Sequence, residues 1–331
     1  MRVRCLASTS TCAIAIVGAL LVSLAAYAAA DDEWTPPRTA DGQPDLQGVW
    51  ANNSATPFQR PSAFAGKETL TDEELEELTK KAAELRDDEQ AGNLLGDYLI
   101  QKVLGDPEFR GFDQDTGNYN SFWLVERQFD NRTSVVVDPP DGRLPALTAE
   151  ARERMAKQGA YRREHPADGP ENFSLGHRCA NFGIPKVGSG YNSYQQIFQT
   201  ANHVVILSEM AHDARIIPIG DGPSLPAAIR QWNGDPRGRW EGDTLVVETG
   251  NFSPQSQFRG SNEHLVLVER YRRTAPDVLT YEVTVTDPTT WTSSWTARIP
   301  LEKSQDAMFE YACHEGNYAM AGSLAGARNC L

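Results

Sequence analysis

The chain has 331 residues, and its 45 aspartate and glutamate side chains outnumber its 31 lysines and arginines, so the formal net charge is −14. This acidic balance argues against nucleic-acid binding, because a phosphate backbone is held by clustered lysine and arginine. It also argues against an anionic membrane surface as a partner. The length suffices for one large domain, or for a domain with a sizeable insertion.

Residues 1–30 have the layout of a cleavable secretory signal. Arg2 and Arg4 precede an apolar run from Cys12 to Leu24, and the small residues of AAYAAA follow just before DDEW. An uncleaved anchor is the alternative, because the run is almost long enough to span a bilayer. Since residues 1–30 hold two arginines and no acidic residue, cleavage would leave 29 basic and 45 acidic side chains, a net charge of −16. The expected product is periplasmic or secreted, with no membrane association.

Three of the five cysteines lie beyond residue 30, namely Cys179, Cys313 and Cys330. An exported protein folds in an oxidising compartment, so we expect one disulfide and one free thiol. We predict that Cys179 pairs with Cys313 and that Cys330 stays free, with a Cys313 to Cys330 bridge as the alternative. A cysteine metal site is disfavoured, because no two of these cysteines show a CxxC spacing.

The first part of the chain predicts one short strand followed by helices. In ADGQPDLQGVW an Asp-Gly turn precedes the strand start at 48–50, and a Gly-x-Trp motif in this position recurs in lipocalin-like barrels. A helix is predicted from Thr71, because Thr71 and Glu74 can form a capping box and Leu70 can pack on Leu75.

Residues 105–192 are irregular and rich in glycine, proline, asparagine and aspartate. A strand at RTSVVVD and a helix from Thr148 to about His165 interrupt them. Such a stretch is too long for a passive connection in a compact domain, and long ordered loops usually cover or build sites. A flexible surface excursion is the alternative.

The C-terminal half is a succession of strand-like segments with short polar breaks. They are YQQIFQT, HVVILSEM, ARIIPIG, RWEGDTLVVET, LVLVERYRRT, VLTYEVTVTD and SWTARIPLEK. In the sixth, Tyr281, Val283 and Val285 alternate with polar residues, and the seventh repeats the pattern. A strict period of two indicates strands with one buried and one solvent-exposed face.

These features predict a mainly β protein, a lipocalin-like antiparallel β-barrel with a helical and irregular N-terminal cover. Seven or eight successive strands close most economically into a barrel, because closure removes exposed edges. A β-sandwich is the alternative. The predicted organisation is a signal at 1–30, the first strand and the cover at 31–192, and at 193–331 an antiparallel meander that closes the barrel and carries the C-terminal CHEGNY motif.

Four blocks of the chain resemble sequences in a large, functionally uncharacterised family of secreted bacterial proteins. They are HVVILSEMAHDARIIPI, RQWNGDPRGRWEGDTLVVETGNF, VTDPTTWTSSWTARIPL and EYACHEGNYAM. The resemblance covers most of the chain from about Pro44 onward, and WEGDTLVVET and YACHEGNY are its most specific parts. It implies a bacterial export route and carries no activity.

The CHEGNY motif is the leading candidate site. It places a thiol, an imidazole, a carboxylate, an amide and a phenol close together, as Cys313, His314, Glu315, Asn317 and Tyr318. The predicted disulfide would make the motif rigid, and rigidity is what a positioned acid–base pair requires. We expect His314 at the barrel mouth to transfer protons with Glu315 or Tyr318 as its partner, while Asn317 holds a polar end of the ligand. The alternative is a disulfide-anchored plug whose polar side chains satisfy buried backbone groups.

A second candidate lies at the joint between two strands, in SEMAHDAR. His212 and Asp213 can orient an imidazole against a carboxylate, the usual way in which a general base is fixed in one tautomer. Arg215 can hold a polar group of the ligand. The alternative is a polar hairpin tip with a surface ion pair.

The block RGRWEGDTLVVETGNF predicts mainly a hairpin that turns at Gly242 and Asp243. Trp240, Asn251 and Arg259 are candidate ligand-binding residues, because they could line a barrel mouth. An aromatic lining suits an apolar or ring-shaped ligand, although such tryptophans are also ordinary core residues.

Neither a metal site nor an organic cofactor is predicted. His212, Asp213, His314 and Glu315 could surround a metal, but their spacing matches no established zinc or iron pattern. The chain contains no GxSxG, GxGxxG or P-loop motif, so classical hydrolase, dinucleotide and nucleotide functions lose their main supports.

The sequence therefore predicts an exported enzyme that acts on a small, partly apolar molecule in a barrel cavity. It would use general acid–base chemistry as a lyase, isomerase or hydrolase. The alternatives are a non-catalytic periplasmic carrier of a small hydrophobic ligand and an envelope interaction module. An enzyme should hold a histidine of perturbed pKa in its cavity, a carrier an all-apolar cavity, and a module an exposed apolar patch.

The exported protein should begin at Asp31 or within two residues of it. Ala28 and Ala30 satisfy the small-residue rule for cleavage, and the acidic cluster follows at once. The intact mass of the exported protein measures the cleavage position. A mass that retains residues 1–30 would instead identify an anchored protein.

Overall fold

The computed structural model describes residues 34–87, 94, 96–105, 125–256 and 258–329. All of the described helices and strands belong to the unit from Pro36 to Leu331. The predicted signal at 1–30 and the predicted free thiol of Cys330 lie outside the described residues. None of the described helices is long and apolar enough to cross a membrane.

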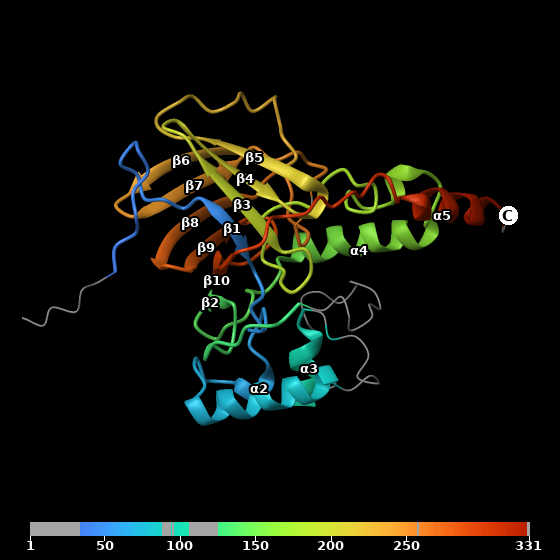
Figure 1. Ribbon diagram of the computed structural model, residues 1–331. Helices are drawn as coiled ribbons and strands as arrows, with labels where there is room; N and C mark the ends of the chain where they lie inside the picture. The colour runs from blue at the N-terminus through green and yellow to red at the C-terminus, as the bar shows by residue number, and fades with distance from the viewer. Residues whose placement is uncertain (1–33, 88–93, 95, 106–124, 257, 330–331) are drawn as a thin grey trace, which may run out of the picture. The chain divides into compact units, whose positions relative to one another are not determined.

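Ten strands among the described residues form a single sheet in the order β5-β4-β3-β1-β10-β9-β8-β7-β6, with β2 paired to β10 (Figure 1). Neighbouring strands run antiparallel. The strand with the Gly-x-Trp motif, β1, lies between β3 and β10 and so connects the two parts of the C-terminal meander. The strands are β1 Gly48–Ala51, β2 Val136–Asp138, β3 Tyr194–Gln199, β4 His203–Ser208, β5 Asp213–Pro218, β6 Asp235–Glu241, β7 Thr244–Gly250, β8 Val266–Ala275, β9 Val278–Thr286 and β10 Trp295–Ser304.

The two ends of the nine-strand path, β5 and β6, meet and nearly close the sheet into a barrel. They are joined by a parallel bridge between Ile219 and Gly238, next to which the N–H of Gly220 donates to the carbonyl of Gly238 at 2.9 Å. The predicted barrel with a helical and irregular N-terminal part is confirmed, and a two-sheet sandwich is not formed. The seam between β5 and β6 is the weakest part of the ladder.

The inside of the barrel is filled with side chains. The predicted alternation is present on β9, where Tyr281, Val283 and Val285 are buried and the residues between them are partly exposed. Trp50 of β1 and Trp295 of β10 are completely buried in the same core cluster. A ligand site therefore has to lie at an end of the barrel.

The helices begin where the sequence signals place them. The N–H of Thr71 donates to Glu74 Oε2 at 2.9 Å and the N–H of Glu74 donates to Thr71 Oγ1 at 3.3 Å, which confirms the capping box. Thr148 caps the next predicted helix by accepting from the N–H of Ala151 at 3.0 Å. The helices are α2 Asp72–Asp87, α3 Tyr98–Leu104, α4 Ala149–Glu164 and α5 Tyr318–Asn329, with 3₁₀ turns η1 Ser62–Phe64, η3 Pro170–Asn172 and η4 Met210–His212.

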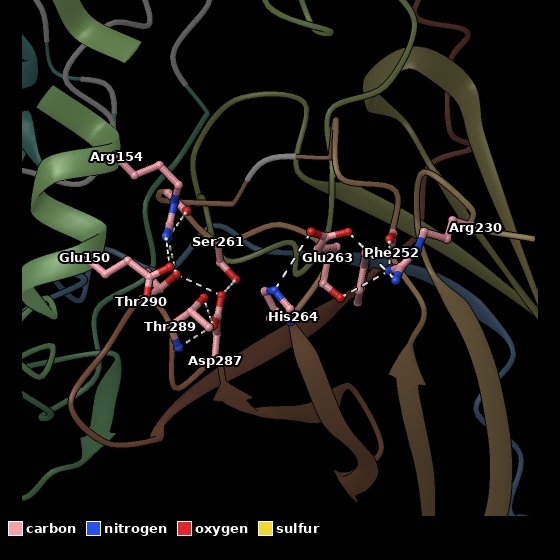
Figure 2. A network of polar contacts seen from close by, with 11 residues as sticks. Glu150, Arg154, Arg230, Phe252, Ser261, Glu263, His264, Asp287, Thr289 and Thr290 are labelled. Carbon is pink, nitrogen blue, oxygen red and sulfur yellow. Dashed lines mark hydrogen bonds and ion pairs between the residues drawn. The ribbon is translucent and has the colours of Figure 1, made fainter. Parts of the chain in front are cut away.

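A buried polar network fastens α4 to the loop between β9 and β10 (Figure 2). The Asp287 carboxylate accepts from the Ser261 hydroxyl, from the Thr289 hydroxyl at 2.7 Å and from the Thr290 hydroxyl at 2.8 Å. Arg154 of α4 donates to the Thr290 hydroxyl at 3.0 Å. Burial opposes the charged carboxylate, but the hydrogen bonds outweigh it and lower the pKa of Asp287. The carboxylate is thus satisfied from several sides, which is typical of a structural network.

The predicted disulfide between Cys179 and Cys313 is confirmed, with the two Cα atoms 5.7 Å apart. It joins residues separated by 134 positions and attaches the C-terminal segment to the irregular part of the chain. In the chain-entropy account, closing a loop of this length stabilises the fold by about 4–5 kcal/mol.

An ion pair crosses the barrel interior from β5 to β8. Arg215 Nη2 donates to Glu269 Oε2, and the two side chains are 8% and 1% exposed. Tyr271 and Tyr281 donate to Glu269 Oε1 at 3.1 and 2.9 Å, and Arg215 also donates to the Thr249 hydroxyl. Burial disfavours the charged guanidinium, but Glu269 outweighs it and raises the pKa of Arg215. The pair ties β5 to β7, β8 and β9 across the weak seam.

Replacing Arg215 by Met should destabilise the fold by about 3–5 kcal/mol, because Glu269 would stay buried without its counter-ion. Glu269→Gln should have a similar effect, and the double variant should cost clearly less than the sum of the two single changes. Arg239→Met, which removes an exposed ion pair with Glu248, is the control and should cost less than about 1 kcal/mol. Urea denaturation of the four variants measures these differences, and strict additivity of the two buried changes would contradict the coupling.

Candidate functional site

A cleft of about 260 Å³ opens where β3 begins and β4 ends. Its walls come from the irregular segment before β3, from the loop after β4 and from the loop before β8. Most of the larger side chains that line it are apolar or aromatic, namely Phe182, Val187, Tyr191, Tyr194, Met210 and Phe258. The composition suits a small ligand with an apolar body.

A small polar cavity adjoins the cleft on the side of the barrel interior. Lys186, Gln195 and Ser208 line both spaces. In the sheet, Gln195 of β3 lies opposite Ser208 of β4, and Ser208 lies opposite Asp213 of β5. Three neighbouring strands therefore present a row of polar residues at this end of the barrel. The deeper wall includes Arg215, Asn233, Glu269 and Tyr271.

The segment that carries Lys186 is held against the chain that follows β1. Asn52 Nδ2 donates to the carbonyl of Gly188 at 2.7 Å, and the N–H of Gly190 donates to the carbonyl of Asn52 at 3.1 Å. Gly190 has a φ of 82°, and a Cβ at this position would lie 2.5 Å from the Arg127 guanidinium. Only glycine fits such a backbone conformation beside so close a neighbour, so the segment has a defined path.

The amine of Lys186 is buried and has no hydrogen-bond partner among the described residues, although the rest of the side chain is partly exposed. Burial lowers the pKa of Lys186 to about 8, because the charged form loses its hydration. The negative charge of Asp213 opposes this shift, and the positive charge of Arg215 adds to it. Buried lysines are usually paired, and an amine with such a pKa is available as a base or a nucleophile near neutral pH.

Both carboxylates that line the polar cavity have hydrogen-bond donors of their own. Asp213 Oδ2 accepts from Asn181 Nδ2 at 3.0 Å and from Asn233 Nδ2 at 2.7 Å. Glu269 is held by Arg215 and by two tyrosine hydroxyls. Neither carboxylate is in hydrogen-bonding contact with Lys186, so the amine keeps its hydrogen-bonding capacity for a ligand.

Gln195 and Ser208 provide further polar groups beside the amine. They are 5% and 8% exposed, and their side chains make no hydrogen bond to another described residue. A hydroxyl can donate and accept, and an amide can do both at once. Together with Lys186, these groups can orient one polar end of a ligand whose remainder occupies the cleft.

The structure places the CHEGNY motif outside these cavities. His314, Glu315 and Tyr318 are exposed, Tyr318 by 81%, and none of them lines the cleft or the polar cavity. The sequence placed His314 and Glu315 at a barrel mouth with Tyr318 as a possible partner, and the structure does not bring these three residues into the described cleft. Asn317 donates to the carbonyl of His177 at 2.9 Å and so holds the loop next to the disulfide.

The second predicted cluster is split by the structure. Asp213 and Arg215 lie in the polar cavity beside Lys186. His212 is exposed and occupies the left-handed region with a φ of 53° at the end of η4. The two inward-facing residues of β5 thus contribute to the candidate site, and the histidine does not line either cavity.

The three other predicted ligand-binding residues do not line the cleft or the polar cavity. Trp240 packs against the barrel core. Asn251 Nδ2 donates to the carbonyl of Ile229 at 2.9 Å and so holds the loop between β5 and β6. The guanidinium of Arg259 lies 5.1 Å from the centre of the Phe58 ring.

In the part of the chain that the structure describes, no cluster of three or more histidine, cysteine, aspartate or glutamate side chains could hold a metal ion.

The sequence did not predict four of the residues that line the site, namely Lys186, Gln195, Ser208 and Glu269. The available signal was weak: Lys186 is a single lysine in GIPKVGSG, within the irregular stretch already expected to cover or build a site.

No protein-family model matches the chain, and no curated protein matches its sequence.

Lys186 should make the stability of the protein depend on pH between about 8 and 10.5. In that range the folded state holds the amine neutral while the unfolded chain keeps its proton, so the free energy of unfolding rises with pH. The full shift corresponds to roughly 3 kcal/mol. Lys186→Met removes this contribution, so wild type should gain stability relative to the variant as the pH is raised from neutral through this range. Urea midpoints at each pH measure the difference, and parallel curves for the two proteins would contradict the assigned pKa.

Proposed function

We propose that this protein is an exported small-molecule enzyme that acts by general acid–base chemistry, with Lys186 as the group that transfers protons. The observation that carries the proposal is the buried amine without a partner among the described residues, placed where an apolar cleft adjoins a polar cavity. A lysine kept in this state has no evident structural use, because a buried amine without a partner destabilises the fold. Such groups are concentrated at functional sites.

Asp213 is the proposed partner of Lys186 in proton transfer. It lines the same cavity, its negative charge acts on the amine, and two asparagine amides fix its orientation. Gln195 and Ser208 would hold the polar end of the substrate. This arrangement suits a lyase, an isomerase or a hydrolase that requires proton transfer at one carbon or oxygen atom.

Export to the periplasm or beyond the cell is part of the proposal. The disulfide between Cys179 and Cys313 supports it, because disulfides persist in oxidising compartments. The leader-like residues 1–30 and the resemblance to secreted bacterial proteins agree with it.

A non-catalytic carrier is the second candidate. The apolar and aromatic lining of the cleft favours it, since a carrier needs a pocket for the body of the ligand and no reacting group. The two candidates differ in what Lys186 does. In a carrier the amine contributes only binding energy, whereas in an enzyme it is required for the chemical step.

The dye 1-anilinonaphthalene-8-sulfonate tests the site, because its aromatic body fits the cleft and its sulfonate suits Lys186. Wild type should bind the dye with a saturable increase in fluorescence. Phe182→Ala and Lys186→Met should each weaken binding about tenfold. The first change removes one apolar contact with the dye, and the second removes one charged hydrogen bond to its sulfonate. His314→Ala, a change on the exposed motif, should bind like wild type. Equal binding by all four proteins would place the ligand elsewhere.

Turnover separates enzyme from carrier. Wild type and Lys186→Met are incubated with a bacterial extract of small molecules, and changes are followed by untargeted mass spectrometry. We expect at least one compound that wild type consumes and that Lys186→Met leaves unchanged, because general acid–base catalysis contributes about 10²- to 10⁴-fold. Dye binding that depends on Lys186, combined with no consumption by wild type, would support the carrier.

A further inference from the structure

Among the charged side chains that line the polar cavity, Lys186 alone has a side chain without any hydrogen bond or ion pair to a described residue. Arg215 is bonded to Glu269, and Asp213 is bonded to two asparagines. A lysine that only bound and released protons could form a hydrogen bond with a carboxylate when no ligand is bound. An amine without such a bond keeps its lone pair free whenever it is neutral.

We propose that Lys186 forms a covalent imine with an aldehyde or ketone whose apolar body occupies the cleft. This inference rests on the proposed function, because it assigns a substrate class to the same site. The apolar lining, which includes Phe182, Met210 and Phe258, would take the body of the molecule. The carbonyl group of the ligand would lie at the end of the cleft, where the cleft adjoins the polar cavity.

The reaction follows from the groups that line this end of the cleft. The neutral amine of Lys186 adds to the carbonyl carbon, and the carbonyl oxygen becomes the hydroxyl of a carbinolamine. The oxygen takes its proton from the nitrogen, so the carbinolamine is neutral. The Asp213 carboxylate then takes the remaining proton from the nitrogen and passes it to the hydroxyl, which leaves as water. The balance is one amine and one carbonyl compound consumed, and one imine and one water formed. No oxidant or reductant is needed.

The neighbours of the amine suit the intermediate. The carbinolamine carries a hydroxyl that can donate and accept, and both Ser208 and Gln195 line the adjoining space with side chains that make no hydrogen bond to another described residue. Burial favours the neutral amine, which is the nucleophilic form, and Arg215 acts in the same direction. The exposed Lys157, whose side chain is 76% accessible, has no comparable surroundings and serves as an internal reference.

Reductive trapping tests the inference on the whole protein. Wild type is incubated near neutral pH with 4-methoxybenzaldehyde and sodium cyanoborohydride, which delivers hydride to the imine carbon and leaves a stable secondary amine. Peptide mass spectrometry then measures the modified fraction of each lysine. We expect at least about tenfold more modification at Lys186 than at Lys157, because burial lowers the pKa of Lys186 and so enlarges the neutral, nucleophilic fraction of its amine.

Two variants complete the experiment. Lys157→Arg is the matched control and should leave the modification of Lys186 unchanged. Lys186→Arg keeps the charge but cannot form an imine, so it should show no preferred adduct while still binding the anilinonaphthalene dye. Modification spread over exposed lysines, with Lys186 unmodified, would overturn the inference. If turnover in that case still depended on Lys186, the proposed function would stand and the amine would act without a covalent step; if turnover did not depend on Lys186, both would fail.

Discussion

The buried ion pair between Arg215 and Glu269 is the interaction on which the rest of the structure depends. Backbone pairing holds every other seam of the barrel, but β5 and β6 meet through the bridge between Ile219 and Gly238. The guanidinium compensates for this by reaching across the interior to a carboxylate on β8. A pair of charges removed from water is stabilising only when its geometry and remaining hydrogen bonds are satisfied, and Tyr271 and Tyr281 complete those bonds.

The same arrangement determines the state of Lys186. Because Glu269 is neutralised by Arg215, it is not free to pair with the amine, and Asp213 is held by the amides of Asn181 and Asn233. The amine is thus buried with no hydrogen-bond partner among the described residues, and this burial lowers its pKa. The near closure of the barrel and the unpaired state of the Lys186 amine among the described residues therefore both involve the same ion pair. Weakening the ion pair would change the electrostatics of the site as well as the fold.

The strands and helix starts could be predicted because their signals are local. The period of two on β9 and the capping box at Thr71 each depend on a few neighbouring residues. The position of β1 could not be predicted, since Trp50 pairs with Gln195 on one side and Lys303 on the other, both far away in sequence. The site was missed for the same reason: nothing around Lys186 indicates burial, which arises only when distant strands close over it.

The C-terminal motif gains a physical explanation from its contacts. Cys313 is bonded to the loop at 177–182, and Asn317 donates to the carbonyl of His177 in that loop. This loop supplies Phe182 to the wall of the cleft and Asn181 to the Asp213 carboxylate. The disulfide of Cys313 and the amide of Asn317 therefore position a loop that lines the cleft, while the imidazole and the carboxylate of the motif face solvent. A cluster of reactive residue types can thus hold the wall of a cleft in place, and a buried amine without a partner among the described residues can lie in a segment that shows no motif.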